Sequence, residues 1–236
     1  MKQESIKSTV SKIFAEEYEI ISTNTEKKIK EILINEVGRD IILTNVMCYN
    51  EKSLNNHAVL NGFIYQTILR DKNKNFINKL IENLPNGIIT LDKSMHLDYQ
   101  PLQNLLINEK FQEADRLTQR YLCKLVQMKT KTERNWLYFT DIQFIPKKDL
   151  FILDLLWKSY SKGKFGFSVQ KKIWTKNNKK WDKLWENIKW LKIEGEMKRY
   201  PKDFTWTVEA PKGHLPLFNQ LRGTQTLSYL FKKIDW

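Results

Sequence analysis

Aromatic side chains alternate with lysine and arginine through much of the second half of the sequence. Residues 134–139 place an arginine beside a Trp, a Leu and a Phe, and Trp174, Trp181, Trp185 and Trp190 recur through a lysine-rich stretch. Two kinds of ligand suit such residues. Single-stranded nucleic acid would stack its bases on the rings while the cations contact phosphates. A planar tetrapyrrole would lie on the same apolar surface, with its carboxylates held by Arg or Lys.

The sequence contains none of the motifs that commonly carry catalysis or bind a metal. It has no nucleophile elbow, no phosphate loop ending in Lys-Ser/Thr, no His-Glu pair at zinc-binding spacing and no cysteine pair. His57, His96 and His214 are far apart and have no carboxylate at a telling spacing. Gly163 and Gly166 lie between helical patterns with no strand before them, unlike a nucleotide-binding loop. We therefore predict no catalytic residue and no metal ligand.

Residues 158–173, KSYSKGKFGFSVQKKI, form the most distinctive segment. Glycine is scarce, with 8 in 236 residues, so Gly163 and Gly166 mark a place where a side chain would be excluded. Two phenylalanines, Phe165 and Phe167, flank Gly166, and Ser168 is a candidate N-cap of the following helix. One interpretation is a corner between helices whose phenylalanines fill the core. The other is a corner that presents an aromatic wall to a ligand.

Composition limits the class of protein. Hydrophobic residues make up 41% and aromatic residues 12%, which excludes a disordered chain. The net charge of +13 indicates an anionic partner, although abundant Lys, Asn and Ile also point to AT-rich coding, which discounts part of that charge. Cys48 and Cys123 are expected to be free thiols in a reducing compartment. With no apolar run long enough to span a bilayer and no signal or transit peptide, we expect a soluble protein.

Helical periodicity predicts an all-α protein of two domains. Residues 1–84 read as a bundle of short amphipathic helices, with Thr25 as one N-cap, and residues 85–97 as a linker. Residues 98–236 read as a mostly helical core domain, in which Asp115 and Thr118 could tie down neighbouring backbone or a facing helix. Asp149 is a candidate N-cap in this domain. Within it, residues 204–208 alternate like a strand or an extended strip. Residues 192–201, KIEGEMKRYP, which contain Gly195 and end at Pro201, are a candidate mobile lid.

Several motifs, in order and at fixed spacing, resemble the genomes-uncoupled-four family, whose members are porphyrin-binding activators of magnesium chelatase in oxygenic phototrophs. The similarity covers about residues 98 to 218. The strongest motifs are GKFGFSVQ and GHLP. The full set is Asp98-Tyr99-x-x-Leu102-x-x-Leu105-Leu106, Ala114-Asp115-x-x-Thr118, Trp136-Leu137, Pro146-x-x-Asp149-Leu150, Asp154-x-x-Trp157, Tyr160 to Gln170 and Ala210-Pro211-x-Gly213-His214-Leu215-Pro216.

This resemblance implies a helical domain shaped like a cupped hand that binds protoporphyrin IX and its magnesium complex. It implies a regulatory protein without catalysis or an intrinsic cofactor, which stimulates magnesium chelatase in chlorophyll biosynthesis through the large porphyrin-binding subunit. We expect a monomer in the plastid stroma, with peripheral membrane association an open alternative and the cyanobacterial cytoplasm another. The rival reading, a basic nucleic-acid-binding or membrane-surface module, rests on charge alone.

We take as candidate porphyrin contacts Arg134, Trp136, Leu137, Phe165, Phe167, Trp190, Met197, Phe204 and Arg222. Arg222 would contact a propionate or, equally well, form a salt bridge to Asp203 or Glu209. Lys192 and Lys198 of the lid are further candidates for a basic rim. His214, in a proline-bracketed loop, is expected to be structural, not an axial metal ligand.

Overall fold

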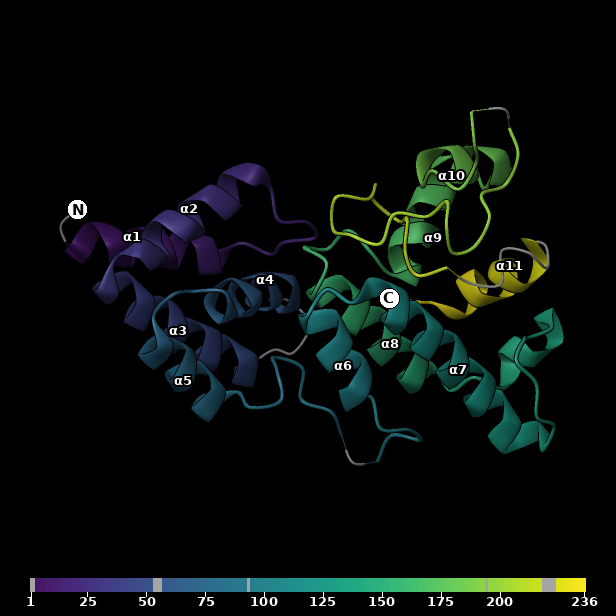
Figure 1. Ribbon diagram of the computed structural model, residues 1–236, viewed down its shortest axis with the longest axis horizontal. Coiled ribbons are helices and arrows are strands. Elements are labelled where there is room, and N and C mark those ends of the chain that lie inside the picture. Colours follow the sequence, from purple (N-terminus) through teal and green to yellow (C-terminus); the bar gives the residue numbers. More distant parts are fainter. Residues whose placement is uncertain (1–2, 53–56, 93, 194, 218–223) are drawn as a thin grey trace. The chain divides into compact units, whose positions relative to one another are not determined.

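The protein folds into two compact units, and both are helical. The computed structural model describes residues 3–52, 57–92, 94–193, 195–217 and 224–236, except the side chains of residues 3 and 49–52. In these ranges the regular secondary structure is α-helix with one 3-10 helix, η1, and no strand (Figure 1). The predicted all-α fold is thus confirmed. One unit consists of residues 1–90 and 158–163, and the other of 91–157 and 164–236.

The first unit is the N-terminal helical bundle expected from the sequence. Its helices are α1 (Gln3–Ala15), α2 (Thr23–Ile34), α3 (Glu36–Lys52), α4 (Ala58–Leu69) and α5 (Lys74–Asn83). Ten of the twelve residues of α4 are buried. Burial on all sides is typical of a helix surrounded by others. α4 is therefore the centre of this bundle.

Six residues from the middle of the chain, 158–163, complete the first unit. Gln66 of α4 donates from Nε2 to the backbone oxygen of Tyr160 at 3.3 Å, and the Tyr160 hydroxyl accepts from the Ile88 N–H at 2.9 Å. Lys162 Nζ lies 2.7 Å from Glu26 Oε2 in α2. The start of the distinctive corner is thus part of the bundle core.

The second unit contains α6 (Gln100–Ile107), α7 (Phe111–Thr130), η1 (Phe139–Phe144), α8 (Lys147–Ser159), α9 (Phe167–Lys176), α10 (Trp181–Asn187) and α11 (Thr224–Lys233). The last two residues of α8 belong to the first unit. Phe111, Trp157 and Phe165 pack together, with ring centroids 5.3 to 6.4 Å apart. Trp157 Nε1 donates to Thr118 Oγ1 at 3.0 Å, so the predicted tie between Thr118 and a facing helix is confirmed.

The two most distinctive sequence motifs are hydrogen-bonded to each other. Gln170 Nε2, in α9, donates to the backbone oxygens of Gly213 at 3.0 Å and Pro216 at 2.8 Å. The Gly166 N–H donates to the Leu215 oxygen at 3.0 Å. Because buried carbonyls need donors, the GHLP loop depends on the GKFGFSVQ corner for its conformation.

Three predicted N-caps are wrong. Ser22 caps α2, and its Oγ accepts from the N–H of Thr25, the predicted cap. α8 begins two residues before Asp149, whose buried carboxylate accepts instead from the Tyr99 hydroxyl at 2.7 Å. α9 starts before Ser168, which is its second residue. The Ser22 cap is local, three residues before the predicted one, whereas the partner of Asp149 lies 50 positions away and could not be read from local pattern.

Of the two alternatives for residues 204–208, the strand is wrong. In the described ranges the one isolated antiparallel bridge joins Leu191 and Met197, outside this segment. The Thr205 N–H, which a strand would offer to a neighbouring chain segment, donates to His214 Nε2 at 3.1 Å. Phe204 is buried, so the alternation of apolar and polar residues reflects packing of an irregular segment.

In the described ranges, no helix has both the length and the apolar character needed to cross a bilayer. The proposed linker at 85–97 remains a prediction, and we further expect the residues after it to fold on their own. The inclusion of 158–163 in the first unit means that a cut in the linker would not separate the two units completely.

Candidate functional site

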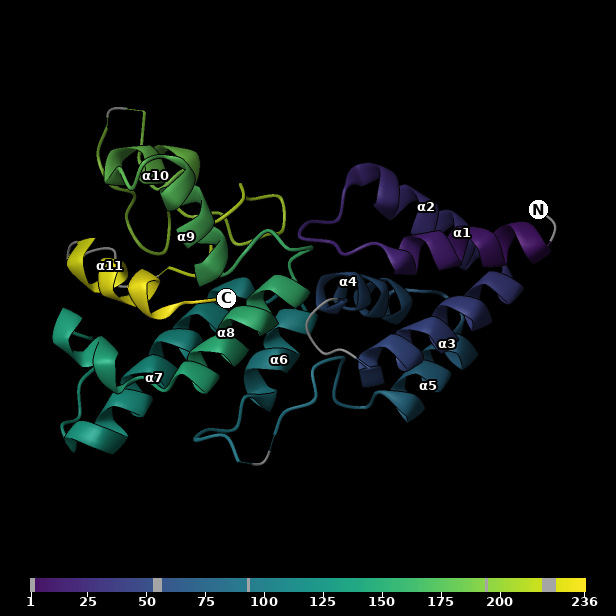
Figure 2. The same cartoon turned by 180° about the vertical axis from the view of Figure 1, so that it is seen from behind.

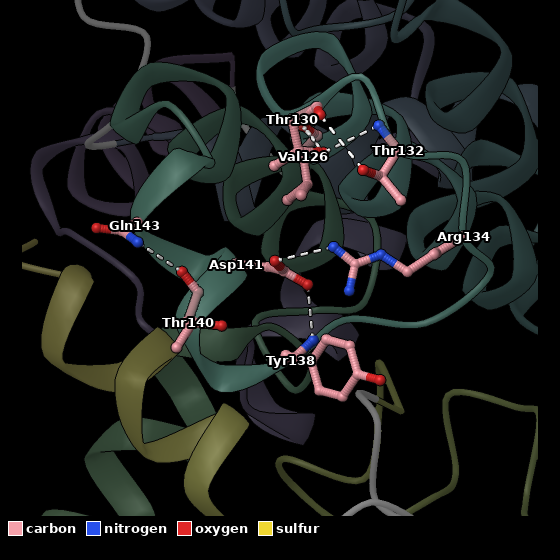
Figure 3. Close-up of polar contacts among 8 residues, drawn as sticks. All are labelled: Val126, Thr130, Thr132, Arg134, Tyr138, Thr140, Asp141 and Gln143. Atoms are coloured by element: carbon pink, nitrogen blue, oxygen red, sulfur yellow. Dashed lines mark hydrogen bonds and ion pairs between the residues drawn. The ribbon is translucent and has the colours of Figure 1, made fainter.

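The loop after α7 positions Arg134 (Figure 3). α7 ends at a C-cap, Lys131, with left-handed backbone (φ 58°). Thr130 Oγ1 donates to the Val126 oxygen at 3.1 Å and accepts from the Thr132 N–H at 3.4 Å. These contacts fix the first turn of the loop, so Arg134 extends from a defined backbone.

Arg134 lies between a carboxylate and an aromatic ring (Figure 3). Its Nη2 donates to Asp141 Oδ1 at 3.2 Å, and its guanidinium carbon is 5.0 Å from the centre of the Tyr138 ring. Asp141 is buried, and its Oδ2 accepts from the Tyr138 N–H at 2.8 Å. The carboxylate thus orients both the arginine and the start of η1.

This arrangement leaves Arg134 able to bind an anion. A guanidinium has five N–H donors, and the contact with Asp141 uses one nitrogen. The side chain is 22% exposed, so the charge is partly dehydrated but still reachable. Charge-assisted hydrogen bonds to a carboxylate are strongest under such conditions.

One exposed aromatic residue, Tyr138, lies beside this arginine, and two more, Phe139 and Tyr229, contact each other. Tyr138, Phe139 and Tyr229 are 51%, 37% and 44% exposed, and we call these three residues the η1–α11 face. The rings of Phe139 and Tyr229 are 5.2 Å apart, and Lys232 Nζ lies 4.9 Å from the centre of the Tyr229 ring. This face offers apolar ring surface flanked by cations, as a flat anionic ligand requires.

A second aromatic group is a continuous row of four tryptophans. Consecutive ring centroids are 4.8 Å apart between Trp174 and Trp181, 5.4 Å between Trp181 and Trp185, and 5.1 Å between Trp185 and Trp190. Trp190 is fully buried and meets Phe204 edge to face at 6.1 Å. The row is therefore a packed aromatic core for α9 and α10.

His214 holds the buried end of this row in place. Its Nε2 accepts from the Thr205 N–H, so Nδ1 carries the proton and donates to the Ile188 oxygen at 2.6 Å. Its own backbone oxygen accepts from Trp190 Nε1 at 2.8 Å. Burial lowers the pKa of the imidazole, which favours the neutral ring. Both ring nitrogens are engaged with backbone, which is the structural role expected of His214.

Outside residue 194, the candidate lid at 192–201 is held by backbone and side-chain contacts close to its start. Lys192 N donates to the Glu196 oxygen at 2.7 Å, and Lys192 Nζ lies 3.0 Å from Asp203 Oδ2. Met197 is half-buried, whereas Ile193 is fully exposed. Of the two lysines expected at a basic rim, Lys192 is thus already paired with a carboxylate.

The structure brings some predicted contacts together and separates others. Arg134, Trp136 and Leu137 share one loop, where Leu137 is buried and Trp136 half-buried. Trp190 and Phe204 form a buried pair. Phe165 and Phe167 are fully buried, as in the interpretation that places them in the core. Arg222 lies outside the described residues. The assignment of these nine residues to a ligand remains a prediction.

Sequence reasoning missed Tyr138, Asp141 and Tyr229. Tyr138 directly follows Trp136 and Leu137, which the sequence analysis named as candidate contacts instead. Asp141 carried a usable signal, because an acidic residue three positions after a helix start commonly accepts from the capping N–H. Tyr229 carried none, because α11 reaches η1 across about 90 residues of sequence.

Asp115 is a buried carboxyl group on α7. Its Oδ1 accepts from the Leu217 N–H at 2.7 Å, which confirms the predicted tie to neighbouring backbone. Burial raises the pKa of this carboxyl to about 8. It therefore links α7 to the end of the GHLP loop, in a state that is sensitive to pH.

Comparison with known proteins identifies the family. Residues 92–234 match the sequence profile described as GUN4-like. An uncharacterized protein ycf53 of Porphyra purpurea is 46% identical over 177 residues, 75% of this chain and 74% of that protein. The tetrapyrrole-binding protein, chloroplastic, of Arabidopsis thaliana is 36% identical over 137 residues, 55% of this chain and 51% of that protein.

A solved structure supports the same family assignment. The structure of GUN4 from Chlamydomonas reinhardtii matches with a TM-score of 0.55 and 38% sequence identity, over 61% of this chain and 91% of that one. The profile spans more than half of the sequence and falls on the part that contains Arg134, the GKFGFSVQ corner and the GHLP loop. The chain belongs to the GUN4-like family.

Proposed function

We propose that this protein binds a tetrapyrrole that carries carboxylate groups, specifically protoporphyrin IX and its magnesium complex, and stimulates magnesium chelatase without catalysis of its own. The observation that supports this best is the partly exposed Arg134, fixed by Asp141, beside the exposed rings of the η1–α11 face. A flat macrocycle would lie on the rings, and a propionate would pair with the guanidinium.

The partner and the location follow from the same proposal. The large porphyrin-binding subunit of the chelatase receives or presents the tetrapyrrole. This protein therefore acts as a carrier that keeps a hydrophobic, photoreactive molecule out of free solution. The plastid stroma is the proposed location, in line with the chloroplastic relative from Arabidopsis thaliana, with the cyanobacterial cytoplasm as the alternative.

Tryptophan emission tests binding directly. All eight tryptophans lie in residues 136–236, in the second unit, so protoporphyrin IX bound there should quench most of the emission in a saturable manner. N-acetyl-tryptophanamide titrated in parallel corrects for light absorbed by the porphyrin itself. Porphyrin binding would be contradicted if the corrected emission stayed unchanged at saturating porphyrin. If the protein also shifted the mobility of mixed RNA, nucleic-acid binding would replace porphyrin binding as the proposed function.

Arg134→Gln should weaken protoporphyrin IX binding by about ten- to a hundredfold, because one charge-assisted contact contributes about 1.5–3 kcal/mol. Arg120→Gln, on an exposed position of α7, makes the same change of charge away from the η1–α11 face and should leave affinity unchanged. Fluorescence titration gives the affinities, and the melting temperature of the ligand-free protein reports any loss of folding. Equal affinities for both variants would remove Arg134 from the site.

A further inference from the structure

The rings of the η1–α11 face come from two elements that are far apart in the sequence. Tyr138 and Phe139 are at the start of η1, whereas Tyr229 lies in α11. α11 packs against η1, and the two elements lie side by side in the views from both sides (Figures 1 and 2). The rings of Phe139 and Tyr229 meet at 5.2 Å with an angle of 50° between their planes. The shape of this face therefore depends on the contacts that hold α11 on η1.

Lys233, the last residue of α11, joins the two elements by hydrogen bonds. Its Nζ donates to the backbone oxygen of Ile142 at 3.0 Å and to that of Gln143 at 2.8 Å. Both oxygens lie near the end of η1, where a helix leaves its last carbonyls short of partners within the helix. An ammonium group can contact several such carbonyls because it carries three N–H donors. Lys233 thus caps η1 from the neighbouring helix.

Lys233 and Tyr229 contact η1 at its two ends. They are four positions apart in α11, so their side chains lie on the same side of the helix. The ring of Tyr229 meets Phe139, the first residue of η1, whereas Lys233 reaches Gln143, the last residue but one. Two contacts one helical turn apart fix both the position and the direction of η1 along α11.

η1 also carries the residue that orients Arg134. Asp141 directly precedes the two carbonyls that Lys233 contacts, and its Oδ1 accepts from Arg134 Nη2 at 3.2 Å. A shift of the end of η1 would move Asp141, and with it the guanidinium, relative to the ring of Tyr229. One contact from α11 can therefore control the spacing between the cation and the aromatic face.

α11 has other anchors, so the contact through Lys233 is not what folds this helix. Its residues Leu227, Leu230 and Phe231 are buried. The Phe231 ring packs on that of Trp174, with centroids 5.4 Å apart. Loss of the Lys233 ammonium group should therefore leave α11 in place while the end of η1 becomes less well fixed.

We propose that Lys233 is a positioning residue for the tetrapyrrole, which it does not need to touch. Its ammonium group fixes η1 on α11 and so sets the spacing between the Arg134 guanidinium and the Tyr229 ring. This step rests on the proposed function, because the ligand is the one proposed there. Groups that are already ordered bind a ligand without the entropic cost of ordering them. A fixed spacing also favours a flat ligand whose carboxylate lies at the matching distance from its rings.

Lys233→Met tests this role, because methionine keeps an unbranched apolar stem but removes the ammonium donors. We expect the full-length variant to bind protoporphyrin IX about tenfold more weakly than the wild type. Lys233→Arg, which keeps the cation and its N–H donors, should recover most of the affinity. Lys74→Met, at an exposed position of α5, makes the same change of charge in the first unit and should bind like the wild type. Tryptophan emission is titrated well below the lowest melting temperature, so that every variant is folded.

A double-mutant cycle with Arg134→Gln separates positioning from a direct contact between Lys233 and the ligand. If Lys233 acts through η1 and Asp141, Lys233→Met should weaken binding clearly less in the Arg134→Gln background than in the wild type. Equal losses in the two backgrounds would show that Lys233 does not act through Arg134 and would overturn the inference.

Hydrogen exchange of the ligand-free protein distinguishes failure of this inference from failure of the proposed function. Over residues 138–145, Lys233→Met should exchange faster than the wild type, and Lys233→Arg should not. If the wild type does not bind protoporphyrin IX, the proposed function is wrong, and the role of Lys233 toward that ligand fails with it even where exchange shows that Lys233 fixes η1. If the wild type binds but Lys233→Met keeps the wild-type affinity or the wild-type exchange, the positioning role alone is wrong.

Discussion

Replacing Asp115 by asparagine should stabilise the protein at pH 8 to 9 by up to about 5 kcal/mol. Burial raises the pKa of the Asp115 carboxyl to about 8, against about 3.9 in an unfolded chain. Between these two values the folded state binds a proton that the unfolded state has lost, so stability decreases as pH rises from about 4 to about 8. Asparagine carries no charge and keeps a carbonyl oxygen for the Leu217 N–H.

Urea unfolding from pH 5 to pH 9 measures this effect. The wild type should lose stability across the range, whereas Asp115→Asn should show a much flatter profile above pH 6.5. The buried His214, whose pKa is lowered, acts in the opposite direction: its neutral ring contributes stability that is lost as pH falls below about 6.5. The interval from pH 7 to pH 9 therefore isolates Asp115.

Asp182→Asn is the matched control, because it removes an exposed carboxyl of α10. Its profile should follow that of the wild type. A profile for Asp115→Asn that runs parallel to the wild type from pH 7 to pH 9 would show that the Asp115 carboxyl is already ionised in the folded protein.

Much of the fold was predictable because it follows from local periodicity and from a few side chains of unusual type. The pairing of α6 with α7 was readable from the apolar faces of the two segments. Asp115 and Thr118 were recognisable as ties, since polar residues on the buried face of a helix need partners. Their actual partners, Leu217 and Trp157, were beyond the reach of local pattern.

Membership of residues 158–163 in the first unit was not predictable from the sequence. The helical pattern of α8 continues through Ser159 without interruption, so nothing local marks the change from one unit to the other. The contacts that decide it, such as Gln66 with Tyr160, join residues 94 positions apart. Long-range contacts of this kind depend on the complete fold.

The candidate site was predictable in residue type but not in arrangement. The sequence identified Arg134 as a cation among apolar residues, but its orientation depends on Asp141, seven residues away across an irregular loop. Phe165, Phe167 and Trp190 were chosen because aromatic residues suit a ligand, and they suit a core equally well. Only burial separates those two roles, and all three are fully buried.

Gly163→Ala should destabilise the first unit by roughly 2–5 kcal/mol, because two separate penalties act at this position. Gly163 has φ of +77°, where an alanine is disfavoured by about 1–2 kcal/mol. A Cβ placed there would also lie 1.9 Å from the backbone oxygen of Glu19, and overpacking of this kind typically costs about 1–3 kcal/mol. Since the obstacle is backbone, it cannot turn aside as a flexible side chain would.

Gly195→Ala separates the two penalties. Gly195 has nearly the same φ, +82°, but an added Cβ meets nothing within 4 Å, so this variant should show only the backbone penalty of about 1–2 kcal/mol. Far-UV circular dichroism during urea unfolding follows the helices of both units, whereas tryptophan emission follows the second unit alone. Gly163→Ala should shift the helical transition to lower urea by clearly more than Gly195→Ala does. Equal shifts for the two variants would mean that residues 158–163 do not lie against the turn at Glu19, and a tryptophan transition that moves together with the helical one in Gly163→Ala would argue against independent folding of the two units.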